Sequence, residues 1–156
     1  MKISIECLVF CVGMALLSGM TMANQIDACP PAYSVVRDRD FSQAVASRKG
    51  SYWKSLEPGG SSLLLQFVGV VLRPIEEGRE VVGYVEGCTY KDYYGGKDGN
   101  DVILRYVVAD GRAVKVKLQD SIYWRATQNE LGRRRYVCTE AGFQACSFTV
   151  LNSRDE

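Results

Sequence analysis

Alternating apolar and polar positions dominate the chain from residue 63 onward and predict a series of β-strands. The first predicted strand covers residues 63–72 and stops at Pro74, before a Glu-Glu-Gly turn that ends at Gly78. The second covers residues 81–90. Both segments are rich in Val, Leu and Tyr, which favour strands when turn residues bound them. The two segments therefore predict an antiparallel hairpin.

A second hairpin is predicted where segments 102–108 and 112–118 flank Asp110-Gly111. This dipeptide readily supplies the positive φ angles of a two-residue hairpin turn. In the second segment, residues 114, 116 and 118 are apolar and residues 115 and 117 are lysines. This period of two predicts that one face of the sheet is buried and that the other meets solvent.

Three further strands are predicted at 122–126, 133–139 and 145–151, of which the last two are joined through a turn at Glu140-Ala141-Gly142. Together these segments predict a mainly β fold with six to seven antiparallel strands. Tight turns and little helix favour a compact sandwich or a partly open barrel, and the pattern does not separate these two architectures.

The segment 40–47 has a different pattern and predicts one short N-terminal helix. Phe41, Ala44 and Val45 recur there at helical spacing. Asp38 or Asp40 can cap its start, since an aspartate side chain accepts hydrogen bonds from the first free N–H groups of a helix.

The start of the chain follows the pattern of a cleavable signal peptide. Lys2 precedes an apolar run over residues 8–17, and small residues end at Ala23. The run is shorter than the roughly 20 residues that span a bilayer, so membrane anchoring is disfavoured. A lipoprotein anchor at Cys11 is disfavoured by the bulky Phe10. We expect residues 1–23 to be removed on Sec-dependent export to a Gram-negative periplasm, leaving one β-domain over 24–156 with no stable membrane insertion.

Four of the six cysteines follow the predicted cleavage site, and an even number in an exported chain predicts two disulfides. Three pairings are open. Cys138 and Cys146 flank a predicted hairpin, which favours joining them, and Cys29 would then join Cys88. Zinc is disfavoured because the chain has no Cys-x-x-Cys pair and no histidine.

No catalytic, cofactor or metal site is predicted. The lack of histidine removes the usual base of serine or cysteine nucleophiles. Ser51-x-x-Lys54 lacks the companion motifs of penicillin-binding enzymes. The segment that starts at Asp98 lacks the bidentate Glu of a calcium loop. A formal net charge of +1 gives no indication of nucleic-acid binding. We therefore expect a protein that is not an enzyme.

Two clusters are candidates for a partner surface. Arg133, Arg134 and Arg135 form a concentrated cationic run, in which strand alternation puts Arg133 and Arg135 on one face. That face is either a solvated strand edge or a contact for an anionic partner. Tyr93 and Tyr94 precede a glycine pair, where aromatic rings either pack on the loop or form a protein interface.

The motifs Cys29-Pro30, Cys88-Thr89-Tyr90 and Cys146-Ser147-Phe148, with Trp53 and Trp124 between them, resemble a family of small secreted bacterial domains without assigned chemistry. Within it, the chain is most similar to the EirA-like periplasmic proteins of intracellular bacteria. This resemblance implies an accessory role that supports a type IV secretion system, with no catalytic residues to carry over.

We therefore expect a non-enzymatic periplasmic protein that binds an envelope protein, with a secretion-system component as the candidate partner. The alternative is a periplasmic inhibitor, similar to lysozyme inhibitors, or a β-domain that binds a small ligand. A hydrolase that works without histidine is a third, weaker hypothesis. The oligomeric state is left open.

Overall fold

A computed structural model describes residues 25–37, 40–55, 65–92, 99–108, 112–119, 122–140 and 142–151. The predicted signal peptide lies outside these residues. The described residues form eleven strands and two short 3-10 helices, η1 and η2. No helix in these ranges is long and apolar enough to cross a membrane.

The elements follow one another along the chain in this order: β1 (Gln25–Asp27), η1 (Ala32–Ser34), β2 (Val36–Arg37), β3 (Ser42–Val45), β4 (Ser51–Ser55), β5 (Leu65–Glu77), β6 (Val81–Asp92), β7 (Asn100–Val108), β8 (Lys115–Leu118), β9 (Arg125–Gln128), β10 (Arg134–Cys138), η2 (Phe143–Cys146) and β11 (Phe148–Val150).

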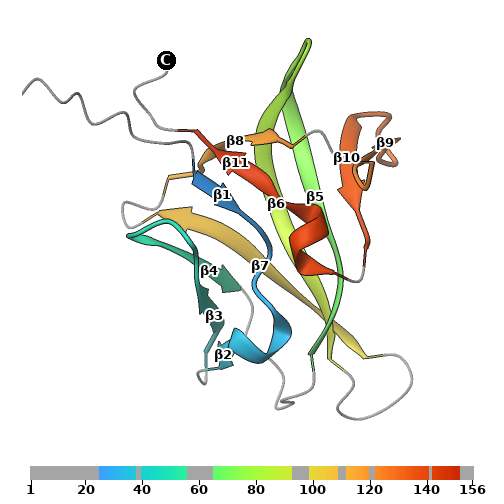
Figure 1. Ribbon diagram of the computed structural model, residues 1–156. Helices are drawn as coiled ribbons and strands as arrows, with labels where there is room; N and C mark the ends of the chain where they lie inside the picture. The colour runs from blue at the N-terminus through green and yellow to red at the C-terminus, as the bar shows by residue number, and fades with distance from the viewer. Residues whose placement is uncertain are drawn as a thin grey trace, which may run out of the picture.

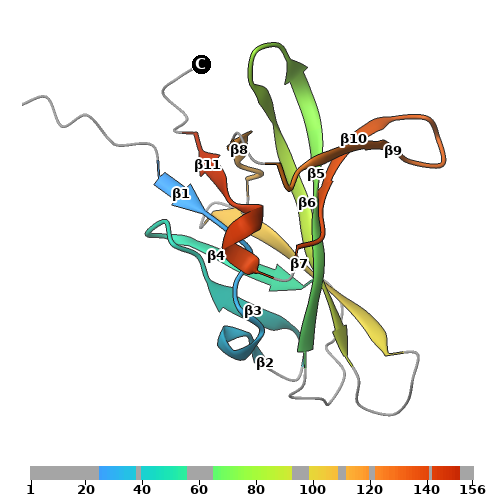
Figure 2. The ribbon, with the colours of Figure 1, turned by 45° about the vertical axis from the view of Figure 1, so that its right-hand side comes forward.

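All eleven strands belong to one antiparallel sheet that curls into a half-barrel (Figure 1). The main path runs β1-β11-β8-β6-β7-β4-β3-β2, and β5, β10 and β9 follow in that order from the other edge of β6. The β9–β10 hairpin projects away from the rest of the sheet, which is clearest in Figure 2. The predicted mainly β, antiparallel fold is confirmed.

The β5–β6 hairpin is the longest in the molecule and matches the first predicted hairpin, with longer arms. Pro74 does not end the first arm, because β5 continues to Glu77. The ladder with β6 shifts register between Pro74 and Glu76. A proline has no N–H to donate, and such an irregularity lets it remain within a strand.

The predicted count of six to seven strands is wrong. Each of the seven predicted segments contains a strand, and four more, β1 to β4, precede them. These four strands are two to five residues long. Their low hydrophobicity hid them, since short strands whose buried positions hold serine or alanine lack the apolar alternation that predicts a strand.

The predicted helix at 40–47 is also wrong, because β3 occupies this segment. Burial alternates along it: Ser42 and Ala44 point inward, and Val45 is 88% exposed. The Ser42 backbone N–H donates to Ser55 Oγ across the sheet at 2.8 Å. The small polar residue Ser42 thus points inward, and Val45, which helical spacing placed on the apolar face, points outward.

The predicted hairpin between 102–108 and 112–118 does not form, although both segments contain strands. β7 pairs with β6 up to Leu104, which lies opposite Cys88, and also with β4. β8 pairs with β6 from Lys115, which lies opposite Tyr84, and with β11. Both strands run antiparallel to the same edge of β6, so β8 continues the direction of β7 and does not return beside it.

The alternation predicted for β8 is confirmed. Val116 is fully buried and Leu118 is 9% exposed, whereas Lys115 and Lys117, which alternate with them, are partly exposed. Lys117 Nζ pairs with Glu80 on the outer side at 2.9 Å. One face of this strand therefore packs on the core and the other meets solvent.

The core is centred on Trp53 of β4, which has no exposed surface. Its ring meets Tyr106 edge-on at 4.9 Å and Phe148 at 6.2 Å between centroids. These three side chains come from β4, β7 and β11 and therefore join distant parts of the sheet.

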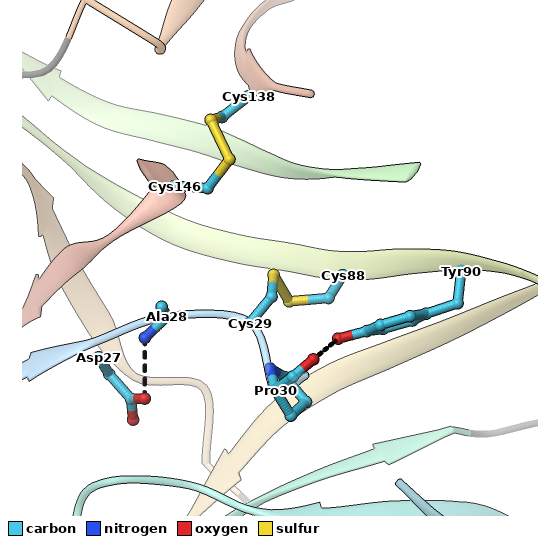
Figure 3. The surroundings of a disulfide bond; sticks show 8 residues. All are labelled: Asp27, Ala28, Cys29, Pro30, Cys88, Tyr90, Cys138 and Cys146. Carbon is cyan, nitrogen blue, oxygen red and sulfur yellow. Dashed lines mark hydrogen bonds between the residues drawn. A yellow bond between two sulfur atoms is a disulfide. The ribbon is translucent and has the colours of Figure 1, made fainter. Parts of the chain in front are cut away.

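Two disulfides cross the core, Cys29–Cys88 and Cys138–Cys146 (Figure 3), which is the pairing favoured by the sequence. All four cysteines are buried. The first bridge ties the segment after β1 to β6, and the second ties β10 to η2. Two disulfides indicate an oxidising, extracytoplasmic compartment.

The N-terminal segment is also held by buried hydrogen bonds. Tyr90 Oη donates to the Pro30 carbonyl at 2.5 Å, beside the Cys29–Cys88 bridge (Figure 3). Tyr106 Oη donates to Asp27 Oδ2 at 2.9 Å. The buried Asp27 carboxylate also accepts from the Ala28 and Ser47 backbone N–H groups, so its charge is met by several donors.

Burial raises the pKa of both Tyr90 and Tyr106 far above the ordinary tyrosine value of 10.0. Below pH 10 both tyrosines are protonated in the folded and the unfolded chain, so they add no pH dependence. Above pH 10 only the unfolded chain releases these protons. We expect the free energy of unfolding to fall by up to about 1.4 kcal/mol per pH unit for each tyrosine.

Urea unfolding of the oxidised protein between pH 9 and pH 11.5 measures this slope. The Tyr90→Phe and Tyr106→Phe variants serve as controls. Each should reduce the slope by up to about 1.4 kcal/mol per pH unit, because the unfolded chain then has one fewer tyrosine proton to release. An unfolding free energy that stays flat above pH 10 would contradict the prediction.

Candidate functional site

A hollow of about 770 Å³ lies where β7 leaves the edge of β6. Its walls come from β5, β6, β7, β10 and the segment just before β8. On β5 and β6, the buried Val70 and Cys88 face the core. Val71, Thr89 and Ile103 occupy the alternate positions beside them and face the hollow. The hollow therefore opens on the outer face of the sheet. The lining residues are Val71, Arg73, Tyr84, Val85, Glu86, Gly87, Thr89, Ile103, Arg105, Tyr106, Val107, Arg112, Ala113 and Arg135.

Positive charge is concentrated in this hollow. Among its described lining residues are four arginines, Arg73, Arg105, Arg112 and Arg135, and one acidic residue, Glu86. They come from four separate places in the chain, and strand pairing brings them together. The whole chain has a formal charge of only +1, so the excess of cations is a local feature of this surface.

The Glu86 carboxylate in the hollow is engaged by one of the arginines that line it. Arg135 Nη2 lies 3.0 Å from Glu86 Oε2 and 3.2 Å from Oε1. The two side chains are 35% and 28% exposed. Solvent reaches this ion pair, so its contribution to stability is small.

Arg73 is placed by an aromatic ring. Its guanidinium lies 5.8 Å from the centre of the Tyr84 ring, directly across the β5–β6 ladder. A cation over an aromatic face is attracted by the electron density of the ring. This contact holds the guanidinium over the sheet while the N–H donors at its edge stay accessible.

Gly87 and Ile103 form part of the apolar floor. A side-chain carbon at Gly87 would lie 2.5 Å from Cγ2 of Ile103, so only glycine lets β7 approach β6 here. Ile103 itself is 47% exposed. With Val71 and Val107, it gives the hollow an apolar surface below the arginines.

Of the predicted partner-surface residues that the structure describes, Arg135 lies in the hollow and Arg133 does not. Arg133 precedes β10 and is exposed in the turn of the β9–β10 hairpin, where its backbone N–H donates to Asn129 Oδ1 at 2.8 Å. Tyr93 and Tyr94 lie outside the described residues. Their role as a partner surface stays a prediction.

The chemistry available in the hollow is the recognition of anions. Guanidinium groups donate paired hydrogen bonds in a geometry that matches carboxylate or phosphate. Across the described ranges, no three His, Cys, Asp or Glu side chains gather as a potential metal site. The described lining supplies cations and apolar side chains, and its carboxylate, Glu86, is already ion-paired with Arg135.

Sequence reasoning missed Arg73, Arg105, Arg112 and Glu86. The signal that could have found Arg105 is the alternation along 102–108, where Val102, Leu104 and Tyr106 are inward and Arg105 stands in the outward row. Nothing local marks Arg73 or Glu86, because their neighbours in the hollow are set by strand pairing.

Comparison with known proteins gives one family match. Residues 22–149 match the family model described as "Protein of unknown function (DUF3757)". No curated protein and no solved structure matches significantly. The match spans nearly all of the part of the chain that the structure describes.

Proposed function

The chain belongs to this DUF3757 family of proteins of unknown function, and we propose that it is a non-enzymatic periplasmic accessory protein that binds an envelope protein. The cationic hollow on the outer face of the sheet carries this proposal, because it is a recognition surface on a disulfide-bonded domain. The resemblance to EirA-like proteins adds a type IV secretion system as the assembly that it supports.

The projecting β9–β10 hairpin supports partner binding as a second contact element. All four residues of β9 are exposed, and Leu131 in the turn is 76% exposed. Arg133 in the turn and Arg135 beside the hollow belong to the same hairpin. A partner seated in the hollow can therefore also contact this arm.

Partner capture from the native envelope tests the proposed function. A tagged copy that functions in the cell is cross-linked in place, purified, and its partners are identified by mass spectrometry. We expect reproducible recovery of one envelope protein, with secretion-system components as the first candidates. Recovery of none, from cells in which the tagged copy is functional, would overturn the proposal.

Small-ligand binding is the second candidate, since the hollow falls within the roughly 300–1,000 Å³ typical of small-molecule sites. Native mass spectrometry of protein purified from the periplasm distinguishes it, because a bound ligand adds a defined mass. A lysozyme inhibition assay on the same sample tests the related inhibitor hypothesis. A bound small molecule with no captured protein would favour this second function.

A further inference from the structure

We propose that the hollow binds an extended, acidic peptide segment of the partner. This inference rests on the proposed function, because it names the chemistry of the partner that this surface recognises. Three features of the hollow carry it: the distribution of charge, the exchangeable Glu86–Arg135 pair, and the break in the sheet beside β6.

The distribution of charge selects an anionic partner. Four arginines and one glutamate are among the described lining residues, in a chain whose formal net charge is only +1. Arginine is the residue best suited to paired hydrogen bonds with carboxylates. Arg105, in the outward row of β7, is exposed and lies opposite Lys54 of β4, so a second cation extends the positive surface beyond the hollow.

The Glu86–Arg135 pair marks the position of a partner carboxylate. The Glu86 side chain places both of its oxygens within 3.2 Å of Arg135 Nη2. Because the pair is partly exposed, its net free energy is small. A carboxylate of the partner can replace Glu86 at little cost, and Glu86 then returns to solvent.

The break in the sheet selects an extended chain. The β6–β7 ladder ends at Cys88, and the β6–β8 ladder begins at Tyr84. Among the described strands, none pairs with residues 85–87 on this edge. Because β7 and β8 occupy the same edge on either side of this gap, a short extended stretch of a peptide can bond to it through its backbone, and its alternate side chains then point to opposite sides.

The apolar floor favours a peptide over a lipid surface or a nucleic acid. Val71, Ile103 and Val107 lie among the arginines. A strand of alternating acidic and apolar residues matches both parts of this surface. The flat charged surface of a bilayer does not enter a recess, and phosphate contacts alone leave the floor exposed.

Fluorescence anisotropy with a labelled peptide of alternating glutamate and valine tests the inference on the mature, oxidised protein. The double variant Arg105→Glu/Arg135→Glu should weaken binding by about tenfold or more, because both carboxylate contacts become repulsive. The matched control Lys49→Glu/Arg79→Glu makes the same charge change at two exposed residues outside the hollow and the β9–β10 hairpin, so it should bind as the wild type does.

A third variant tests whether a partner carboxylate replaces Glu86 on Arg135 or is only attracted by the positive charge of the hollow. Glu86→Gln removes the internal competitor for Arg135 and should tighten binding by about threefold to tenfold. A merely structural role of the Glu86–Arg135 pair predicts unchanged or weaker binding. Circular dichroism confirms that each variant keeps its fold.

Three results would overturn the inference: no saturable binding of the acidic peptide at millimolar concentration, equal loss in the two double variants, or binding only to vesicles of anionic phospholipid or to a polyphosphate. Partner capture repeated with Arg105→Glu/Arg135→Glu separates this outcome from the proposed function. Undiminished capture of the same envelope protein would leave the proposed function standing and remove the hollow as its site.

Discussion

Replacing Cys29 and Cys88 by serine is expected to lower the free energy of unfolding by about 4 kcal/mol, because the unfolded chain regains the freedom of a long closed loop. This bridge joins residues 59 apart in sequence, whereas Cys138 and Cys146 are 8 apart. Loop-closure entropy grows with the length of the loop. The Cys138→Ser/Cys146→Ser variant is therefore expected to lose only about 2.5 kcal/mol.

Denaturant unfolding of both double variants beside the wild type measures this difference, and the short-loop variant is the matched control. All four cysteines are buried, so both variants place two serines in the core and pay similar desolvation costs. An equal loss in the two variants, or a larger loss for the short loop, would show that loop length does not govern their stability.

Truncating Trp53 to alanine is expected to cost about 3–5 kcal/mol, the range for removing a large buried aromatic side chain. Trp53 is fully buried and meets the rings of Tyr106 and Phe148 edge-on. Its loss leaves a cavity where β4, β7 and β11 meet. Thermal unfolding followed by near-ultraviolet circular dichroism measures the resulting loss of stability.

Trp53→Phe is the matched control, because it keeps an aromatic ring in the core but removes the indole N–H. Among the described residues, the indole Nε1 of Trp53 has no hydrogen-bond partner, so phenylalanine removes an unsatisfied donor together with part of the ring. We expect a loss smaller than for alanine, of under about 2 kcal/mol. A phenylalanine variant as unstable as the alanine variant would contradict this account of the core.

Local pattern predicted which side chains of the C-terminal strands are buried, and it failed on how the strands pair. In β8, alternation separates Val116 from Lys117 correctly, because one face of this strand meets solvent. Asp110-Gly111 favours a hairpin within its own few residues. β6 instead offers one edge to both β7 and β8, and competition from a distant strand cannot be read from a turn dipeptide.

The N-terminal strands and the hollow were missed for a related reason. Ser42, Ser51 and Ser55 are buried in β3 and β4, so size and hydrogen bonding outweigh hydrophobicity at these positions. In the hollow, Glu86 and Arg135 are far apart in sequence and meet only because β10 joins β5 and β5 joins β6. Arg135 was predicted as a candidate because a run of three consecutive arginines can be recognised from the sequence alone.

The path of β7 past β6 makes the half-barrel a modular scaffold. After Leu104, β7 leaves β6 and pairs with β4 as far as Val108, whereas β8 pairs with the same edge of β6 from Lys115. Residues 112–114 precede β8 and belong to no strand, so they can change without altering the register of β7 on β4 or of β8 on β6. Evolution or protein engineering can therefore rebuild one wall of the hollow, and with it the choice of ligand, while the rest of the sheet keeps its alignment.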